Sequence, residues 1–420
     1  MIKHRSPILI IFLFVFVNGW GQEPVRLSLK QAEDLAIRNN YQLNASLHRL
    51  EQGYYVYKAS KAYFKPKFSL SSELEIAKNQ RGLDSALRMI QPLFDKVAFY
   101  TLKESQIQWE ILRLDVQRQI CELLFQVREA YYTVLLNQAH LAVDQIVVQL
   151  WEEELKRQKC RLELGLTIPF EFNQVNLHLK EAWSDYYATQ SEMRSSQIKL
   201  LTILGFPPHT VLHLVEQKIS LPSSQWQECS FKQWKQWALQ YCPKLKQQQF
   251  SYLLSQNKIS QTKAENVPTL SFYANAGHRY INNGFDNQPY IGLGLNLDWT
   301  LYDPSNQQRI KQAREGSREL AASYCQLELE IDAMIDYLLV EMDKAYVAYL
   351  NSQERAVLAE EGVRMATKQH QLGLISSFEY RDAIKSLHEA QQQVNQSKFD
   401  LYHTYDQLIQ QTGLDLAQPN

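Results

Sequence analysis

Large apolar residues alternate with small or polar ones, without a break, from residue 291 to residue 301. The apolar positions are Ile291, Leu293, Leu295, Leu297, Trp299 and Leu301. This length and period of two are typical of a tilted transmembrane strand that has lipid on one face and water on the other. We expect its partner strand over 269–280, and a loop facing the exterior over 281–288.

An earlier segment repeats the alternation less regularly and predicts a first β-hairpin over 66–94. The apolar positions of its first strand are Phe68, Leu70, Leu74 and Ile76. The return stretch, 83–93, keeps the period poorly and contains Arg88. Two interpretations therefore stay open for this hairpin, a membrane hairpin and a soluble one.

Two very long stretches lack the residues that break helices. Proline costs about 3 kcal/mol and glycine about 1 kcal/mol inside a helix, relative to alanine. Neither occurs between Phe94 and Leu164, and residues 305–413 contain no proline and few glycines. We therefore expect helices over 96–164 and 304–372, each about 100 Å long. A seam with helical spacing predicts coiled-coil packing; its residues are Ile120, Leu124, Val127, Tyr131, Val134 and Leu141.

The second half of the chain repeats the landmarks of the first half in the same order. Leu164-Gly165-Leu166 returns as Leu372-Gly373-Leu374. We expect a first repeat over 22–206 and a second over 231–414, joined by a linker over 207–230 and followed by a tail over 415–420. Each repeat would hold a helix of about 35 residues, a β-hairpin, a long helix, a tight turn and a second helix of about 35 residues. The hairpin, the long helix and the second helix are expected over 66–94, 96–164 and 170–204 in the first repeat. In the second repeat they are expected over 268–302, 304–372 and 377–412. Two short helices end to end match one long helix, so such rods could build a tube.

Residues 1–21 have the pattern of a secretory signal peptide. The positive residues Lys3, His4 and Arg5 precede an apolar run over 8–17, which is too short to span a bilayer as a helix. We therefore expect the protein to be exported.

Composition and motifs exclude several classes of function. A formal net charge of −1 gives no basic surface for nucleic acid. The chain has no P-loop and no His-Glu-x-x-His, so we expect no enzyme activity and no cofactor. His209 and His213 have the spacing of metal ligands on a helix, but they follow two prolines, so we predict no metal site. We expect the acids at 152–154 to lie on a solvent-exposed face of a helix.

The duplicated layout, the two Leu-Gly-Leu turns and the strand exits Pro92-Leu93-Phe94-Asp95 and Thr300-Leu301-Tyr302-Asp303 resemble the TolC family of outer-membrane efflux proteins. The resemblance implies a mainly α-helical chain with four β-strands. Three protomers would close a twelve-stranded barrel in the outer membrane, continued by a helical tunnel in the periplasm. It also implies a passive duct that meets a membrane-fusion adaptor and an inner-membrane pump of the RND or ABC type.

The same resemblance implies roles for residues near the two turns. Gly165, Leu166, Gly373 and Leu374 would form the periplasmic tip that docks the adaptor. Glu379 and Asp382 would ring the aperture, with Glu171 and His370 beside them. The alternative for the acids is that they only stabilise helix N-termini. His370 and Ile375 stand where the family has a gating tyrosine and arginine, and Pro169 also departs from the pattern, so the usual closing contacts cannot be carried over. Protonation of His370 is the trigger of aperture opening that we consider.

One alternative from another class stays open, a periplasmic coiled-coil adaptor or a structural scaffold. An adaptor would have one helical hairpin flanked by β domains, and a scaffold would not need a strand patterned for lipid. The duplication and the strand near residue 295 favour the export duct. The sequence does not identify the exported substrate.

Overall fold

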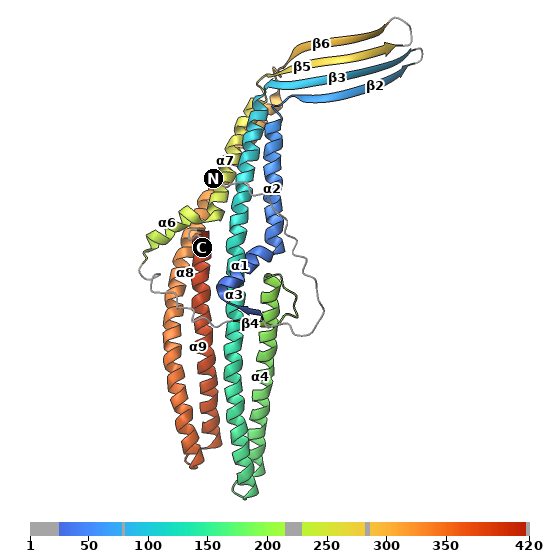
Figure 1. Cartoon of the computed structure of the whole chain (residues 1–420). Coiled ribbons are helices and arrows are strands. Elements are labelled where there is room, and N and C mark those ends of the chain that lie inside the picture. Colours follow the sequence, from blue (N-terminus) through green and yellow to red (C-terminus); the bar gives the residue numbers. More distant parts are fainter. Residues whose placement is uncertain (1–24, 78–79, 215–228, 282–285, 417–420) are drawn as a thin grey trace.

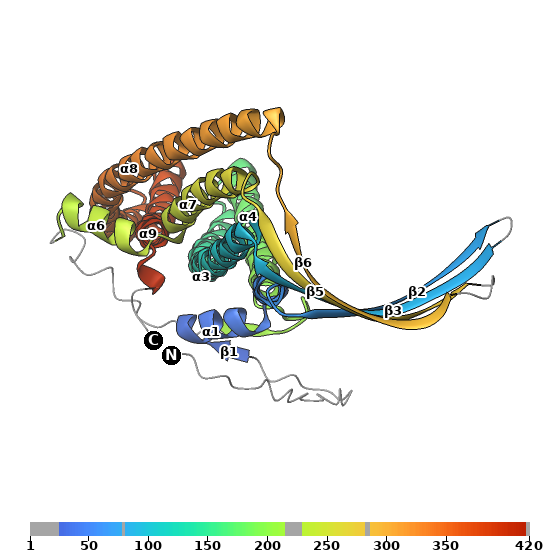
Figure 2. The same cartoon turned by 90° about the horizontal axis from the view of Figure 1, so that it is seen from above.

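The computed structural model describes residues 25–77, 80–214, 229–281 and 286–416. The chain forms a long rod of helices that carries a four-stranded sheet at one end (Figure 1). Viewed along the rod, the sheet curves away from the helices as a narrow strip (Figure 2). This architecture confirms the predicted mainly α-helical chain with a β part. The predicted signal peptide, 1–21, lies outside the described residues.

Two helices of 68 residues, α3 (Lys96–Glu163) and α8 (Pro304–Gln371), run along the rod. Each begins just after an aspartate whose side chain caps the first turn. Asp95 accepts a backbone N–H at 2.8 Å, and Asp303 accepts one at 2.9 Å. In the part of the chain that the structure describes, no helix combines the length and apolar character needed to cross a membrane.

Each long helix turns back at a glycine with a left-handed backbone. Gly165 (φ 70°) leads to α4 (Pro169–Ile203), and Gly373 (φ 73°) leads to α9 (Ser377–Thr412). The residue after each glycine donates its N–H to a carbonyl of the last helical turn, at 2.8 and 2.9 Å, which closes the helix end. We call α3 with α4 helical hairpin 1, and α8 with α9 helical hairpin 2.

The prediction of a single helix at the start of each repeat is wrong, because the structure has two helices there. They are α1 (Leu29–Asn39) and α2 (Tyr41–Ala62), then α6 (Phe231–Tyr241) and α7 (Pro243–Ala264). Asn40 is extended (ψ 117°), and its side chain caps α2 by accepting the N–H of Leu43 at 2.9 Å. Cys242 is extended (ψ 114°) because the ring of the following Pro243 disfavours a helical backbone before it.

All four long strands belong to one antiparallel sheet, in the order β2, β3, β5, β6. Their bounds are β2 (Lys67–Ala77), β3 (Gln80–Phe94), β5 (Thr269–Ile281) and β6 (Asp286–Asp298). The two β-hairpins therefore form one continuous sheet. This favours a membrane hairpin over a soluble one for the first pair of strands.

The strand register places the apolar residues on one face. Leu70, Leu87, Ala276 and Ile291 lie opposite one another across the four strands, and opposite residues share a face. Arg88 lies on the other face, so it does not interrupt the apolar one. The predicted outward positions Leu270, Phe272, Ala274 and Ala276 of β5 pair with Leu297, Leu295, Leu293 and Ile291 of β6.

The predicted strand over 291–301 is too long at its end. The pair Thr269 and Asp298 is the last one between β5 and β6, so Trp299 and Leu301 lie beyond the strand. The indole N–H of Trp299 donates to the carbonyl of Asn266 at 3.2 Å, which ties the chain back to the start of the hairpin. The alternation continues past the point where the chain has a partner strand.

Two tyrosines cover glycines on the polar face of the sheet. Tyr273 lies opposite Gly294, and Tyr290 lies opposite Gly277. A Cβ atom at Gly294 would come within 2.4 Å of the Tyr273 ring, and one at Gly277 within 2.7 Å of the Tyr290 ring. These glycines therefore make room for aromatic rings on the polar face.

A buried ionic cluster joins the two repeats near the middle of the rod. Arg128 of α3 contacts Glu33 at 2.6 Å, Asp415 at 2.8 Å and Asp406 at 3.5 Å. Burial raises the pKa of Asp406 to about 7, although Arg128 opposes this shift. The three acids come from α1, α9 and the short helix η1 (Leu414–Leu416), so one guanidinium links four elements.

Little of the linker predicted over 207–230 is structured in the described residues. β4 (Leu212–Leu214) pairs in parallel with β1 (Val25–Leu27) at mid-height of the rod (Figure 1). Residues 215–228 of this linker, and residues 417–420 of the predicted tail, lie outside the described residues.

The glycines after α8 and after α9 have different surroundings, so the same substitution at each should have a different effect. Gly413 and Gly373 both have φ near 70°, but a Cβ at Gly413 would lie 2.7 Å from the carbonyl oxygen of Tyr241, whereas one at Gly373 would meet no atom within 4 Å. Gly413→Ala should lower the thermal unfolding midpoint by several degrees more than Gly373→Ala, measured by circular dichroism. Equal losses would show that backbone strain, about 1–2 kcal/mol at both sites, is the whole effect.

Candidate functional site

The helical hairpins turn at the end of the rod opposite the sheet (Figure 1). This end is rich in exposed apolar side chains. They flank the two glycine turns and are Leu164, Leu166, Ile168, Phe170, Leu372, Leu374 and Phe378. Each is more than half exposed, and a cluster of this kind on a protein surface indicates an interaction site. Leu166 and Leu374, predicted to form the tip, are 64% and 71% exposed.

The acids predicted at the aperture lie at the starts of α4 and α9. Glu379 accepts the backbone N–H of Ser376 at 2.7 Å and forms a capping box with it. This backbone hydrogen bond lowers the pKa of Glu379. Glu171, in the first turn of α4, accepts the side-chain hydroxyl of Thr167, and no side chain caps this helix by a hydrogen bond. Glu379 thus caps α9 in the single chain. Glu171 lies where the helix dipole favours an acid, and Asp382 is exposed at the edge of a groove.

His370 is not exposed at the tip, because it is packed between the two helical hairpins. Its side chain is only 7% exposed, and its ring stacks on Tyr380 with centroids 4.9 Å apart. Its Nε2 atom lies 3.0 Å from Glu154 of α3, and its Nδ1 atom lies 3.4 Å from the carbonyl oxygen of Ile375. The hydrogen bond with Glu154 raises the pKa of His370.

Glu154 is the centre of this contact, although the sequence places it in a solvated acidic face. Its side chain is 2% exposed. Besides His370, it contacts Arg157 at 3.0 Å and Gln158 at 2.9 Å. Burial alone would raise the pKa of Glu154, but the hydrogen bonds of His370 and Gln158 outweigh burial, so this pKa is lowered. The carboxylate is therefore held in its charged form.

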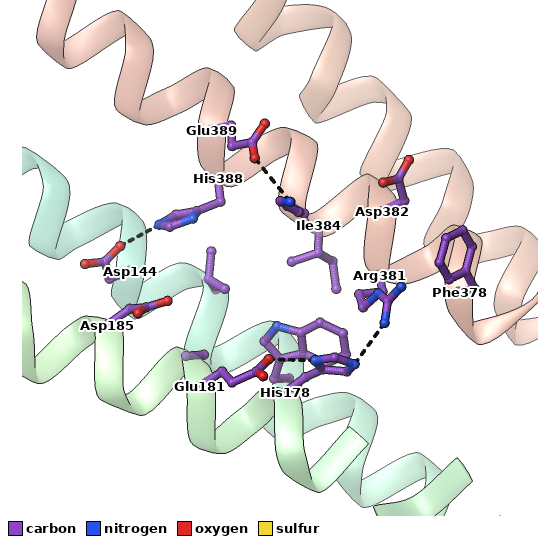
Figure 3. A pocket seen from close by; sticks show the side chains of 14 residues that line it. Asp144, His178, Glu181, Asp185, Phe378, Arg381, Asp382, Ile384, His388 and Glu389 are labelled. Carbon is purple, nitrogen blue, oxygen red and sulfur yellow. Dashed lines mark hydrogen bonds and ion pairs between the residues drawn. The ribbon is translucent and has the colours of Figure 1, made fainter. Parts of the chain in front are cut away.

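A groove of about 570 Å³ lies between the helical hairpins, further from the tip (Figure 3). Its walls are α3, α4 and α9, and it combines apolar with charged side chains. Figure 3 shows His388 reaching across to Asp144, and Arg381 reaching across to His178. These two contacts measure 2.7 and 3.3 Å.

The histidines of the groove use their ring atoms differently. His178 contacts Glu181 through Nδ1 at 2.8 Å and Arg381 through Nε2. Because an arginine can only donate, Nε2 of His178 accepts in this contact, and Nδ1 donates to Glu181. Asp144 is 2% exposed, and its contact with His388 lowers its pKa against the effect of burial.

The two acids that join the helical hairpins, Asp144 and Glu154, were not predicted from the sequence. One signal was present for Asp144, a lone acid between Val143 and the apolar run at 146–148. Glu154 gave no signal, because it is flanked by other acids. The pairing of either acid with a histidine more than 200 residues away could not be read from spacing. Among the residues that the structure describes, no group of three metal-binding side chains is suitably placed.

The family model described as "Outer membrane efflux protein" matches residues 33–206 and 234–414. The alkaline protease secretion protein AprF of Pseudomonas aeruginosa is 21% identical, over 98% of this chain and 91% of its own. The outer membrane protein TolC of Vibrio cholerae is 20% identical, over 92% of this chain and 90% of its own.

Solved structures of channels have the same fold. The Campylobacter jejuni CmeC outer membrane channel superimposes with a TM-score of 0.77 at 16% identity, covering 92% of this chain and 85% of its own. The outer membrane protein VceC of Vibrio cholerae gives 0.78 at 12% identity, covering 92% and 96%. The fold and the two matched repeats favour a duct over an adaptor or scaffold. The chain belongs to the outer membrane efflux protein family and is an outer-membrane export channel component whose helices extend into the periplasm.

Proposed function

We propose that three copies of this chain form one passive export duct. The observation that carries this proposal is a four-stranded sheet with one apolar face and two open edges, β2 and β6, on top of a helical rod. Four strands are too few to close a barrel, which needs about eight, and strand edges are not left unpaired in lipid. Three copies would supply twelve strands, with β6 of one copy beside β2 of the next.

The helical part supports the same assembly. One long helix, α8, exposes a series of large apolar side chains in the single chain: Leu329, Tyr337, Val340, Val347, Val357, Leu358 and Met365. A neighbouring copy would remove these side chains from water. We propose that α8 packs on the next protomer, and that the repeats at 22–206 and 231–414 alternate around a tunnel.

Partners follow from the family. AprF is named as a secretion protein, and the chain is similar to it over nearly its whole length. We propose that the duct works with a membrane-fusion adaptor and an inner-membrane pump of the RND or ABC type, and that the pump supplies the energy. The apolar tip around Gly165, Leu166, Gly373 and Leu374 is the surface that we propose for the adaptor.

The tip can be tested by adding charge where apolar side chains are exposed. Leu166→Glu with Leu374→Glu should reduce export at least about tenfold, because each leucine that the adaptor would cover contributes roughly 1.5–3 kcal/mol to binding. The trimer should form normally, since both side chains are exposed. Export of a reporter substrate and co-purification of the adaptor are the measurements.

The matched control adds the same two charges at polar positions of the same end, Asn173→Glu with Gln371→Glu. Both residues are exposed, and neither change removes an apolar side chain. Normal export in the leucine variant, or equal loss in the control, would contradict docking through the apolar tip.

We also propose that Glu379 and Asp382, with Glu171 near them, face the axis of the trimer. Six carboxylates of Glu379 and Asp382 would then surround one aperture and favour cations. Their proximity would raise the pKa of Glu379 through repulsion of like charges, against the lowering that Ser376 causes.

The assembly is tested by fractionating cells and running the outer-membrane fraction on SDS gels with and without boiling. A band of three times the chain mass that boiling dissociates would support the duct. A monomer in the soluble periplasmic fraction would overturn it. Ion conductance of the purified trimer in a planar bilayer then tests whether the assembly is open along its axis.

A further inference from the structure

Arg88 is an exposed cation on the polar face of the sheet. Within the part of the chain that the structure describes, its side chain forms no hydrogen bond or ion pair. Arg279, on the same face, is instead paired with Asp84 at 3.2 Å. The strand register places Arg88 opposite Asn275, and Asn275 opposite Gly292. We call Arg88, Asn275 and Gly292 the arginine row.

Gly292 differs in its surroundings from the glycines of the rows on either side. A Cβ atom at Gly292 would meet no atom within 4 Å, whereas one at Gly277 or Gly294 would collide with a tyrosine ring. The pair Gly277 and Tyr290 lies one row nearer the loop of the hairpin, and the pair Tyr273 and Gly294 lies one row nearer the helices. Neighbouring rows on one face are about 7 Å apart. The arginine row is therefore an opening between two aromatic rings.

Asn275 brings unused hydrogen-bonding capacity to this opening. Within the described residues its side chain forms no hydrogen bond, and its Oδ1 atom is buried. A half turn of the amide group exchanges the oxygen with the two N–H donors, so either can face Arg88 on the next strand. Leaving such a group without a partner costs free energy, which a bound molecule would recover.

The charges around the arginine row favour an anion. On β2 and β3 the acids nearest to Arg88 are Glu73 and Asp84, which lie opposite each other two rows away, about 13 Å along the strand. Asp84 is already engaged by Arg279 and by the hydroxyl of Tyr290 at 3.1 Å. The positive charge of Arg88 is therefore left without a neighbouring carboxylate.

The donors of the row indicate which anion would bind. A guanidinium donates two parallel N–H groups to a carboxylate, and the amide of Asn275 can add a third from the adjacent strand. The rings of Tyr273 and Tyr290 bound the opening on both sides, and their edges carry partial positive charge. A carboxylate attached to a flat ring uses both the donors and the rings, whereas a small inorganic anion uses only the donors.

We propose that the arginine row binds the carboxylate of flat organic anions on the inner wall of the duct. The inference rests on the proposed duct, in which the polar face of the sheet lines the water-filled lumen, and it adds a class of solute that this wall holds. Three copies would place three such sites at one level of the barrel. A wall that passes its cargo on must release it, so we expect a dissociation constant on the order of 1–10 mM at low salt.

The test is fluorine NMR of para-fluorobenzoate mixed with the purified full-length trimer, in which line broadening reports binding. The neutral para-fluorobenzamide, which has the same ring, should bind at least about tenfold more weakly. Arg88→Gln should weaken benzoate binding at least about tenfold, because the charged donor is lost. Gly292→Val should weaken it similarly, because valine fills the open space while the charge of Arg88 remains. Binding should also weaken as salt is raised from about 0.05 M to about 0.5 M.

The matched control is Lys67→Gln, which removes an exposed cation from the same face one row nearer the helices, opposite Ile90. It should leave benzoate binding within about twofold of the wild type. Equal losses in Lys67→Gln and Arg88→Gln would show that overall charge attracts the anion, and would overturn the site. Equal binding of the benzoate and the benzamide, or unchanged binding in Arg88→Gln, would also overturn it.

These outcomes are distinct from failure of the duct. A boiling-sensitive trimer that binds no benzoate would overturn the arginine row as a site and leave the duct standing, whereas absence of a wild-type trimer would overturn the duct. If Gly292→Val does not assemble, the comparison of Arg88→Gln with Lys67→Gln still decides, because both side chains are exposed.

Discussion

Arg128→Met is expected to lower the free energy of unfolding by about 3–5 kcal/mol, the usual cost of removing one partner from a buried ionic group. The variant leaves Glu33, Asp406 and Asp415 close together without a cation. Methionine replaces the stem of the arginine, so the loss reports the missing charge more than a cavity. The temperature at which the purified protein loses its helical circular dichroism is the measurement.

The loss should be larger at pH 8 than at pH 5. The pKa of Asp406 is raised to about 7 by burial, so between these pH values the aspartate gains a negative charge that only Arg128 compensates. Arg118→Met is the matched control, because Arg118 lies on the same helix and pairs with Asp115 and Glu122 at a more exposed site. Its cost should stay within about 1 kcal/mol. Similar losses in both variants, or no dependence on pH, would contradict a buried cluster that needs Arg128.

Leu295→Arg is expected to destabilise the proposed barrel by about 2–4 kcal/mol per copy, the cost of an arginine on the lipid face near the bilayer midplane. Leu295 lies opposite Phe272 on the apolar face of the sheet and is 64% exposed in the single chain. In the proposed assembly this exposed side chain would contact lipid. Urea unfolding in lipid vesicles, and the amount of boiling-sensitive trimer in the outer membrane, measure the effect.

The neighbouring residue provides the control. Asn296 follows Leu295 in β6 and faces the opposite side of the sheet, opposite Ser271. Asn296→Arg should cost no more than about 1 kcal/mol, although it can change ion selectivity. If the two variants behave alike, the two faces do not meet different surroundings, and the sheet is not a membrane barrel.

Much of the fold could be predicted because its signals are local and periodic. The absence of helix breakers predicted both helices of 68 residues, and the alternation over 291–301 predicted the face of β6. The resemblance to the efflux family depended on the order of such signals. The exact end of β6 was missed, since the alternation says nothing about where the partner strand starts. The break at Asn40 was missed, since an asparagine is tolerated in a helix as well as at its cap.

The long helices, the glycine turns and the apolar face of the sheet follow from residues that are close together in the chain, and the order of these signals reveals the two repeats. Which polar residues meet depends on how the helices pack in three dimensions. Glu154 and His370, Asp144 and His388, and Arg128 with its three acids are contacts between distant segments. A buried charge needs a partner at the right distance, and that distance is fixed by how the helices pack rather than by spacing along the chain.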